Sequence, residues 1–128
     1  MDFDKKKVLL IDDERDFLDA LSERMRNRGL NVATAASATE AIRKAEKETY
    51  DVLVLDLHMP EMDGLETLKI LKGNNPDIHV ILLTGYAAAE KAIPAMLSGA
   101  EEILEKPSDV EVLVRKIHKL VTEKMVKV

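Results

Sequence analysis

Five short apolar runs recur along the chain, and each ends against polar or turn-forming residues. They are rich in β-branched residues and nearly continuous in apolar character, which predicts strands near residues 8–11, 32–35, 52–55, 80–83 and 102–104. Strands that are buried on both faces lose the polar half of the alternating pattern. The runs therefore indicate a parallel sheet that is covered by helices on both sides.

The segments between these runs carry apolar residues at helical spacing. Residues 15–28 form one such segment, which stops at Gly29, a residue suited to the left-handed position after a helix. Residues 37–40 (Ser-Ala-Thr-Glu) have the form of a capping box at a helix start. Further helices are predicted at residues 65–72, 87–98 and 110–121. The alternation predicts a (βα)5 unit, an α/β domain of three layers.

Length, composition and charge narrow the class of protein. With 128 residues, of which 46% are hydrophobic, the chain can bury one sizeable core, so we expect a single domain over residues 1–128. Without cysteine it has no disulfide, thiolate metal site or cysteine nucleophile. The net charge of -5 leaves no broad basic face for nucleic acid. No segment is typical of a membrane span or a signal peptide, so we expect a cytoplasmic protein that does not enter a membrane.

Candidate chemistry lies where the predicted strands end. Asp12 and Asp13 follow the first strand, Asp56 the third, Thr84 the fourth and Lys106 the fifth. In a doubly wound sheet the carboxyl ends of all strands face one edge, where ligands bind. We therefore expect these five side chains, which are distant in sequence, to meet in space.

The chemistry of this set favours a divalent cation beside a phosphorylatable carboxylate. Clustered carboxylates repel one another unless a proton or a cation neutralises them, and Mg²⁺ prefers oxygen ligands, with Mn²⁺ as a substitute. Asp56 is the candidate nucleophile because it stands alone after the most apolar strand. Lys106 would neutralise charge on the phosphoryl oxygens, and Thr84 would donate a hydrogen bond to one of them.

Four motifs in this order resemble those of response-regulator receiver domains of two-component signalling, the CheY-like family. They are residues 10–14 (Leu-Ile-Asp-Asp-Glu), 56–64 (Asp-Leu-His-Met-Pro-Glu-Met-Asp-Gly), 83–85 (Leu-Thr-Gly) and 105–107 (Glu-Lys-Pro). The similarity extends from residue 7 to about residue 120. It implies a flavodoxin-like fold whose five parallel strands have the order 2-1-3-4-5.

The resemblance also implies a role for each matching residue. Asp13 resembles the direct metal ligand, Asp12 its acidic neighbour that acts through water, and His58 the position whose backbone carbonyl completes the ligand set. Asp56 resembles the acceptor of a phosphoryl group from a histidine kinase or a phosphotransfer protein. The remaining positions resemble the switch hydroxyl, the phosphate-binding lysine and the proline after a cis peptide bond: Thr84, Lys106 and Pro107.

Three positions depart from the family pattern or tune it. Ile103 stands where an aromatic residue is common, so we expect the switch to depend mainly on Thr84 and the loop after it. Pro94 makes the fourth helix start late or kinks it, which reshapes the face of the fourth helix, fifth strand and fifth helix through which receivers form homodimers. Tyr86 could shield the acyl phosphate from water and prolong its lifetime.

The expected activity is self-modification rather than turnover of an outside substrate, so we do not expect an enzyme in the usual sense. One alternative is a small aspartyl-phosphate phosphatase, which would use Asp12 as nucleophile. A second is a flavodoxin-type flavin-binding module, although residues 12–14 would repel the flavin phosphate. A third is a receiver-like domain that is not phosphorylated. Residues 122–128 could extend the last helix toward a missing output domain.

Overall fold

In the computed structural model of the chain, residues 6–56, 64–85, 92–106 and 109–126 are described. Strands and helices alternate along these residues, as the apolar pattern predicts. The strands are β1 (Lys7–Ile11), β2 (Asn31–Ala35), β3 (Val52–Asp56), β4 (His79–Thr84) and β5 (Glu102–Glu105). The helices are α1 (Arg15–Asn27), α2 (Ala38–Lys47), α3 (Gly64–Asn74), α4 (Ala92–Leu97) and α5 (Val110–Val126).

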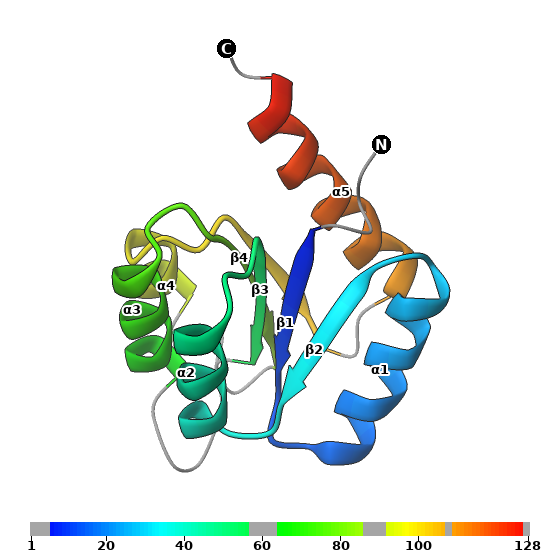
Figure 1. Ribbon diagram of the computed structural model, residues 1–128, viewed down its shortest axis with the longest axis horizontal. Helices are drawn as coiled ribbons and strands as arrows, with labels where there is room; N and C mark the ends of the chain where they lie inside the picture. Colours follow the sequence, from blue (N-terminus) through cyan, green and yellow to red (C-terminus); the bar gives the residue numbers. More distant parts are fainter. Residues whose placement is uncertain (1–5, 57–63, 86–91, 107–108, 127–128) are drawn as a thin grey trace.

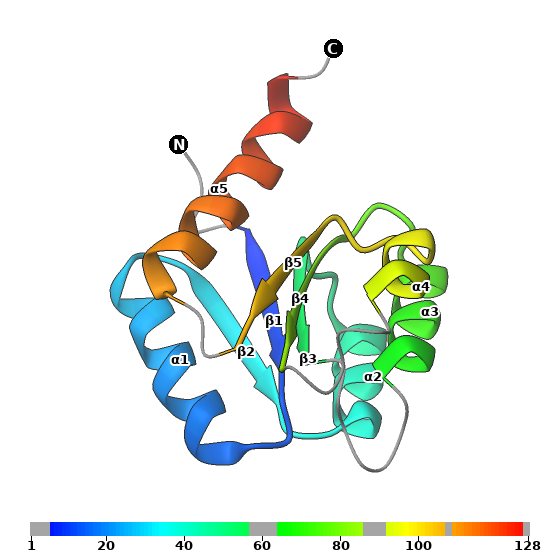
Figure 2. The same ribbon diagram turned by 180° about the vertical axis from the view of Figure 1, so that it is seen from behind.

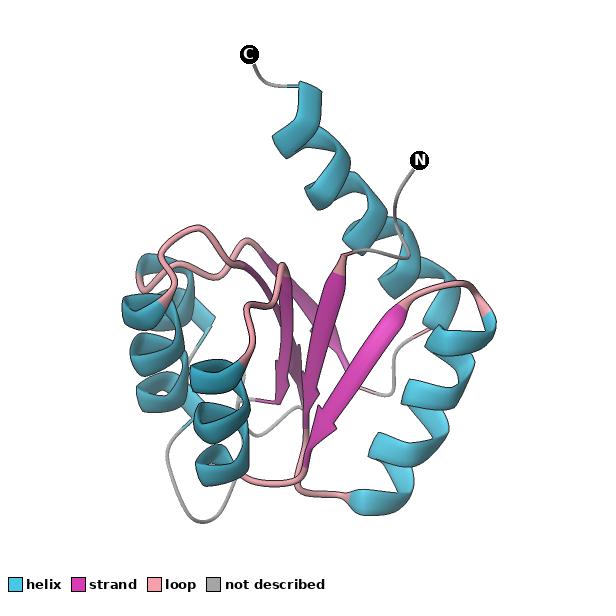
Figure 3. Cartoon of the chain, in the orientation of Figure 1, coloured by secondary structure: helices cyan, strands magenta, loops and turns pink. Residues whose placement is uncertain are grey.

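The strands form one parallel sheet with the order β2-β1-β3-β4-β5, which confirms the predicted topology. Val8 of β1 pairs with Val32 on one side and with Val52 on the other. Helices α2, α3 and α4 cover one face of the sheet, and α1 and α5 cover the other (Figures 1 and 2). The three-layer arrangement is plain when the elements are coloured by type (Figure 3).

Two apolar clusters fill the space between the sheet and its helices. Alternate residues of each strand enter opposite clusters: Leu9 and Leu53 contribute to the cluster that contains Leu68 of α3. Leu10 belongs instead to the cluster that contains the apolar stripe of α5. All five residues of β3 are buried. This double burial explains why the strands read as continuous apolar runs.

Local sequence signals at two helix ends behave as predicted. Gly29 has a φ of +89°, the left-handed conformation that ends α1. The Ser37 hydroxyl accepts a hydrogen bond from the Glu40 amide at 3.1 Å. The Glu40 carboxylate reaches one residue further back than a standard capping box, to the amide of Ala36 at 2.7 Å.

Helix α4 is short, and Pro94 is its third residue. In the first turn of a helix the missing amide proton of proline is not required, so the late start fits the described part of this segment. Residues 86–91, which we expected to belong to the same helix, lie outside the described residues. The side chain of Leu97, near the end of α4, is 85% exposed.

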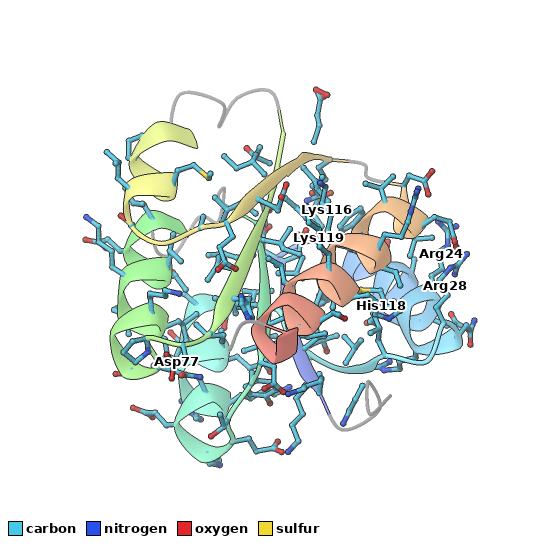
Figure 4. The ribbon with its side chains drawn as sticks, turned by 90° about the horizontal axis from the view of Figure 1, so that it is seen from above. Arg24, Arg28, Asp77, Lys116, His118 and Lys119 are labelled. Atoms are coloured by element: carbon cyan, nitrogen blue, oxygen red, sulfur yellow. The ribbon has the colours of Figure 1, made fainter. Side chains whose placement is uncertain are left out.

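Helix α5 runs from the carboxyl ends of the strands past the opposite edge of the sheet (Figures 1 and 2). Figure 4 looks onto this opposite edge and shows Arg24 on α1, Arg28 just after α1, and Lys116 and Lys119 on α5. Arg28 pairs with Glu111, so part of this positive charge is neutralised. Among the described residues, no helix combines the length and apolar character needed to cross a membrane.

Candidate functional site

The strand order brings the predicted site residues to one edge of the sheet. Asp12 follows β1, Asp56 and Thr84 end β3 and β4, and Lys106 follows β5. Backbone hydrogen bonds fix these ends, since the Asp12 amide donates to the Ala35 carbonyl at 3.1 Å and the Lys106 amide to the Thr84 carbonyl at 2.9 Å. The side chains of Asp12, Asp56 and Lys106 meet at this edge, as predicted.

Three carboxylates crowd together at this edge. Asp12, Asp13 and Asp56 each offer an oxygen within 4.8 Å of the others. The residue Asp12 is 0% exposed and Asp56 is 4% exposed. Burial raises the pKa of Asp12 above its usual value, and the charge of Asp56 adds to this rise, while hydrogen bonds from Lys106 and the Glu14 amide oppose it. The cluster therefore holds negative charge that is incompletely compensated.

Lys106 supplies the positive charge of the site. Its Nζ lies 2.8 Å from Asp12 Oδ2, 2.5 Å from Glu14 Oε1 and 3.4 Å from Asp56 Oδ2. Burial alone would lower the pKa of Lys106, but hydrogen bonds to Asp12 and Glu14 and the nearby carboxylate charges raise it above its usual value. The ammonium also lies 4.6 Å from the centroid of the Phe17 ring, within cation–π range. Lys106 therefore carries its charge at neutral pH, beside the candidate nucleophile.

Thr84 is buried at the end of β4, and its hydroxyl donates to the Gly85 carbonyl at 3.1 Å. This hydroxyl must rotate away from Gly85 before it can bond a group on Asp56. Ile103 is partly buried and packs against the cluster that contains Leu82. The predicted positions His58, Tyr86 and Pro107 lie outside the described residues.

Sequence reasoning missed two members of the site, Glu14 and Phe17. Both contact the Lys106 ammonium, although neither directly follows a strand and neither was among the predicted site residues. Glu14 continues the acidic run after β1, and Phe17 lies one turn further along α1. The only sequence signal was their position beside Asp12 and Asp13.

The donor set fits a hard divalent cation. All three clustered groups are carboxylates, and oxygen is the ligand type that Mg²⁺ and Mn²⁺ prefer. Their crowding in a largely buried position creates a repulsion that a cation relieves. Asp12, Asp13 and Asp56 could therefore hold such an ion, with waters at the positions that the protein leaves open.

Comparisons with known proteins agree with this geometry. The profile of the family described as response regulator receiver domain matches residues 8–118. The transcriptional regulatory protein ZraR of Escherichia coli (strain K12) is 37% identical over 109 residues, which are 85% of this chain and 25% of ZraR. The chain thus spans about a quarter of that relative's length.

Solved structures show the same fold. A response regulator receiver domain protein from Clostridium thermocellum superposes with a TM-score of 0.89 at 34% identity, covering 96% of this chain and 99% of the other. A response regulator protein from Burkholderia pseudomallei, solved with a phosphorylated aspartic acid, a calcium ion and citrate, gives a TM-score of 0.81 at 31% identity and covers 94% and 73%.

Proposed function

Because the chain belongs to the response regulator receiver domain family, we propose that it accepts a phosphoryl group on Asp56 and thereby switches its conformation to control an output partner or domain. The observation that carries this proposal is the meeting of Asp56 with two further carboxylates and one ammonium at the carboxyl edge of the sheet. The phosphorylated aspartic acid in the Burkholderia pseudomallei relative supports it.

The transfer uses the carboxylate of Asp56 as nucleophile. Its oxygen forms a bond to phosphorus while the bond from phosphorus to the donor breaks, and the donor leaves as neutral imidazole after taking up a proton, or as acetate. Asp12, Asp13 and Asp56 would hold Mg²⁺, whose charge would offset the charge on the phosphoryl oxygens. Lys106, whose raised pKa keeps it charged, lies 3.4 Å from Asp56 and stabilises the same oxygens.

We propose that Thr84 transmits the change. A phosphoryl group offers its hydroxyl a charged acceptor in place of the Gly85 carbonyl. Because the Thr84 carbonyl accepts a hydrogen bond from the Lys106 amide, movement at the end of β4 also affects the segment that follows β5. Ile103 is aliphatic and partly buried, so an inward rotation of an aromatic ring plays no part, and the shift in population depends on Thr84 and the loop after it.

The acyl phosphate is lost by hydrolysis, in which water attacks phosphorus and releases inorganic phosphate from Asp56. This is self-dephosphorylation rather than turnover of an outside substrate. We propose that Tyr86 slows the step by shielding phosphorus. The phosphatase alternative is disfavoured because the carboxylate of its nucleophile, Asp12, lies closer to Lys106 than Asp56 does and also accepts a hydrogen bond from the Glu14 amide.

The proposed setting follows from the family. A sensor histidine kinase or a phosphotransfer protein would donate the phosphoryl group, and two receivers would pair through α4, β5 and α5. We propose that residues 1–128 form the receiver unit, with residues 122–128 leading toward an output domain, in the cytoplasm. With a net charge of -5, contact with nucleic acid falls to another domain or chain.

The test is phosphorylation of the purified chain by acetyl phosphate with Mg²⁺, followed by intact-mass measurement. We expect wild type to gain the mass of one phosphoryl group and Asp56→Asn to gain none. Asp77→Asn is the matched control, since Asp77 is an exposed aspartate just before β4, at the opposite edge of the sheet (Figure 4). Modification of Asp56→Asn to the wild-type level, or no modification of wild type, would refute the proposal.

A further inference from the structure

Glu14 occupies the N-cap position of α1 but does not use its side chain as a cap. Its backbone is extended, with φ -82° and ψ 97°, and its carbonyl accepts the Leu18 amide at 2.9 Å. A carboxylate at a helix start is favoured by the positive end of the helix dipole and can stay in solvent. The Glu14 carboxylate makes no capping hydrogen bond and instead contacts Lys106, 92 positions away, at 2.5 Å.

The Lys106 ammonium thus lies nearer to Glu14 than to the candidate phosphoacceptor. It is 2.5 Å from Glu14 and 3.4 Å from Asp56. Phe17, three residues after Glu14 on the same side of α1, places its ring beneath the ammonium. The start of α1 therefore provides a carboxylate and an aromatic face that share the Lys106 ammonium with Asp12 and Asp56.

We propose that Glu14 and Phe17 are positioning residues that hold Lys106 in a resting position, from which a phosphoryl group on Asp56 must draw it. The inference rests on the phosphoacceptor function proposed above. While Glu14 shares the ammonium, Lys106 neutralises Asp12 and Asp56 less, which favours a divalent cation at the carboxylates. When a phosphoryl group is present, the same pairing competes with it for the ammonium.

Loss of the Glu14 charge should therefore have two opposite effects. In Glu14→Gln, Lys106 pairs more fully with Asp12 and Asp56, so the affinity for Mg²⁺ falls. At saturating Mg²⁺ the freed ammonium binds a phosphoryl analogue better. The Glu14 carboxylate is 65% exposed, and exposed ion pairs are weak, so we expect each affinity to change by about two- to fivefold.

The experiment measures both affinities by calorimetry, first with Mg²⁺ alone and then with beryllofluoride at saturating Mg²⁺. Asp16→Asn is the matched control, because it removes the same charge from the exposed first turn of the same helix. It reports the long-range part of the effect. We expect Glu14→Gln to change both affinities more than Asp16→Asn does. We expect Phe17→Leu to change them in the same directions by less than Glu14→Gln does.

A double-mutant cycle shows whether Lys106 carries the effect. In the Lys106→Met background we expect Glu14→Gln to change Mg²⁺ affinity no more than Asp16→Asn does. The inference is overturned if Glu14→Gln still changes Mg²⁺ affinity more than Asp16→Asn does when Lys106 is replaced. It is also overturned if Glu14→Gln changes that affinity no more than Asp16→Asn does when Lys106 is present. These outcomes are separate from failure of the proposed function, in which wild type binds Mg²⁺ but acetyl phosphate leaves Asp56 unmodified.

Discussion

Replacing Asp13 by asparagine should stabilise the folded chain when no divalent cation is present. The substitution keeps the size of the side chain and removes one charge from a cluster whose oxygens lie within 4.8 Å of one another. Asp13 is half-buried and, among the described contacts, has no ion pair with Lys106. Asp13→Asn therefore removes repulsion without breaking a known salt bridge.

The size of the effect follows from the distance. At 4.8 Å, the upper limit of these oxygen separations, two unit charges repel by about 3.5 kcal/mol at an effective dielectric constant of about 20, and by about 0.9 kcal/mol in bulk water. Asp13 is partly solvated, and Lys106 offsets part of the charge on Asp12 and Asp56. A stabilisation of about 1 to 2 kcal/mol, below the sum over both pairs, is expected.

Urea denaturation provides the assay, performed once with a chelator and once with saturating Mg²⁺. With the chelator, Asp13→Asn should unfold at higher urea than wild type. With Mg²⁺, wild type should gain stability from the bound ion, and the variant should gain much less. Asp19→Asn, an exposed site on α1 outside the cluster, controls for the change in net charge.

The reasoning is refuted if Asp13→Asn is less stable than wild type in the chelator while Asp19→Asn is unchanged. That result would mean that the Asp13 carboxylate makes a net favourable contribution without a cation. Equal gains from Mg²⁺ in wild type and Asp13→Asn would show that Asp13 does not bind the ion.

Two further predictions concern Thr84 and Tyr50. Thr84→Val keeps the shape of a buried side chain but removes its hydroxyl, so phosphorylation should persist while the phosphorylation-dependent NMR shifts of β4 and β5 largely disappear; full wild-type shifts in the variant would contradict this. Burial, together with the charge of Glu48, raises the pKa of Tyr50 above its usual value of 10.0. Above pH 10.0 the unfolded chain binds fewer protons at this side chain than the folded one, so stability should fall with rising pH, and less steeply in Tyr50→Phe than in wild type; equal slopes in urea denaturation would count against this.

Much of the fold can be predicted from the sequence because strands that are buried on both faces form continuous apolar runs. β3 is apolar up to Asp56, and a polar residue in an otherwise apolar run marks the point where the strand reaches the sheet edge. Gly29 and Ser37 marked a helix end and a helix start because their backbone and side-chain chemistry suits those positions. The meeting of Asp12, Asp56 and Lys106 then follows from parallel strand order.

The contacts of Glu14 and Phe17 could not be predicted in the same way. A glutamate before a helix is usually a solvated side chain, and an aromatic residue in the first turn usually packs on the core, as Phe17 also does. Their contacts with Lys106 depend on where its flexible side chain comes to lie after β5, and that is decided by packing between segments some 92 positions apart. Likewise, Pro94 predicted that α4 either starts late or is kinked, and the sequence could not decide between the two.

The central place of β1 has a consequence for how the chain is made. β1 leaves the ribosome first, yet it lies between β2 and β3, so one of its edges has no partner until the segment ending at Asp56 has been synthesised. Such long-range parallel pairing is slow to form. The strand that carries Asp12 is therefore fixed on both sides only when the strand that carries Asp56 docks beside it. Asp12 and Asp13 therefore gain the third carboxylate of the cluster only when β3 pairs with β1.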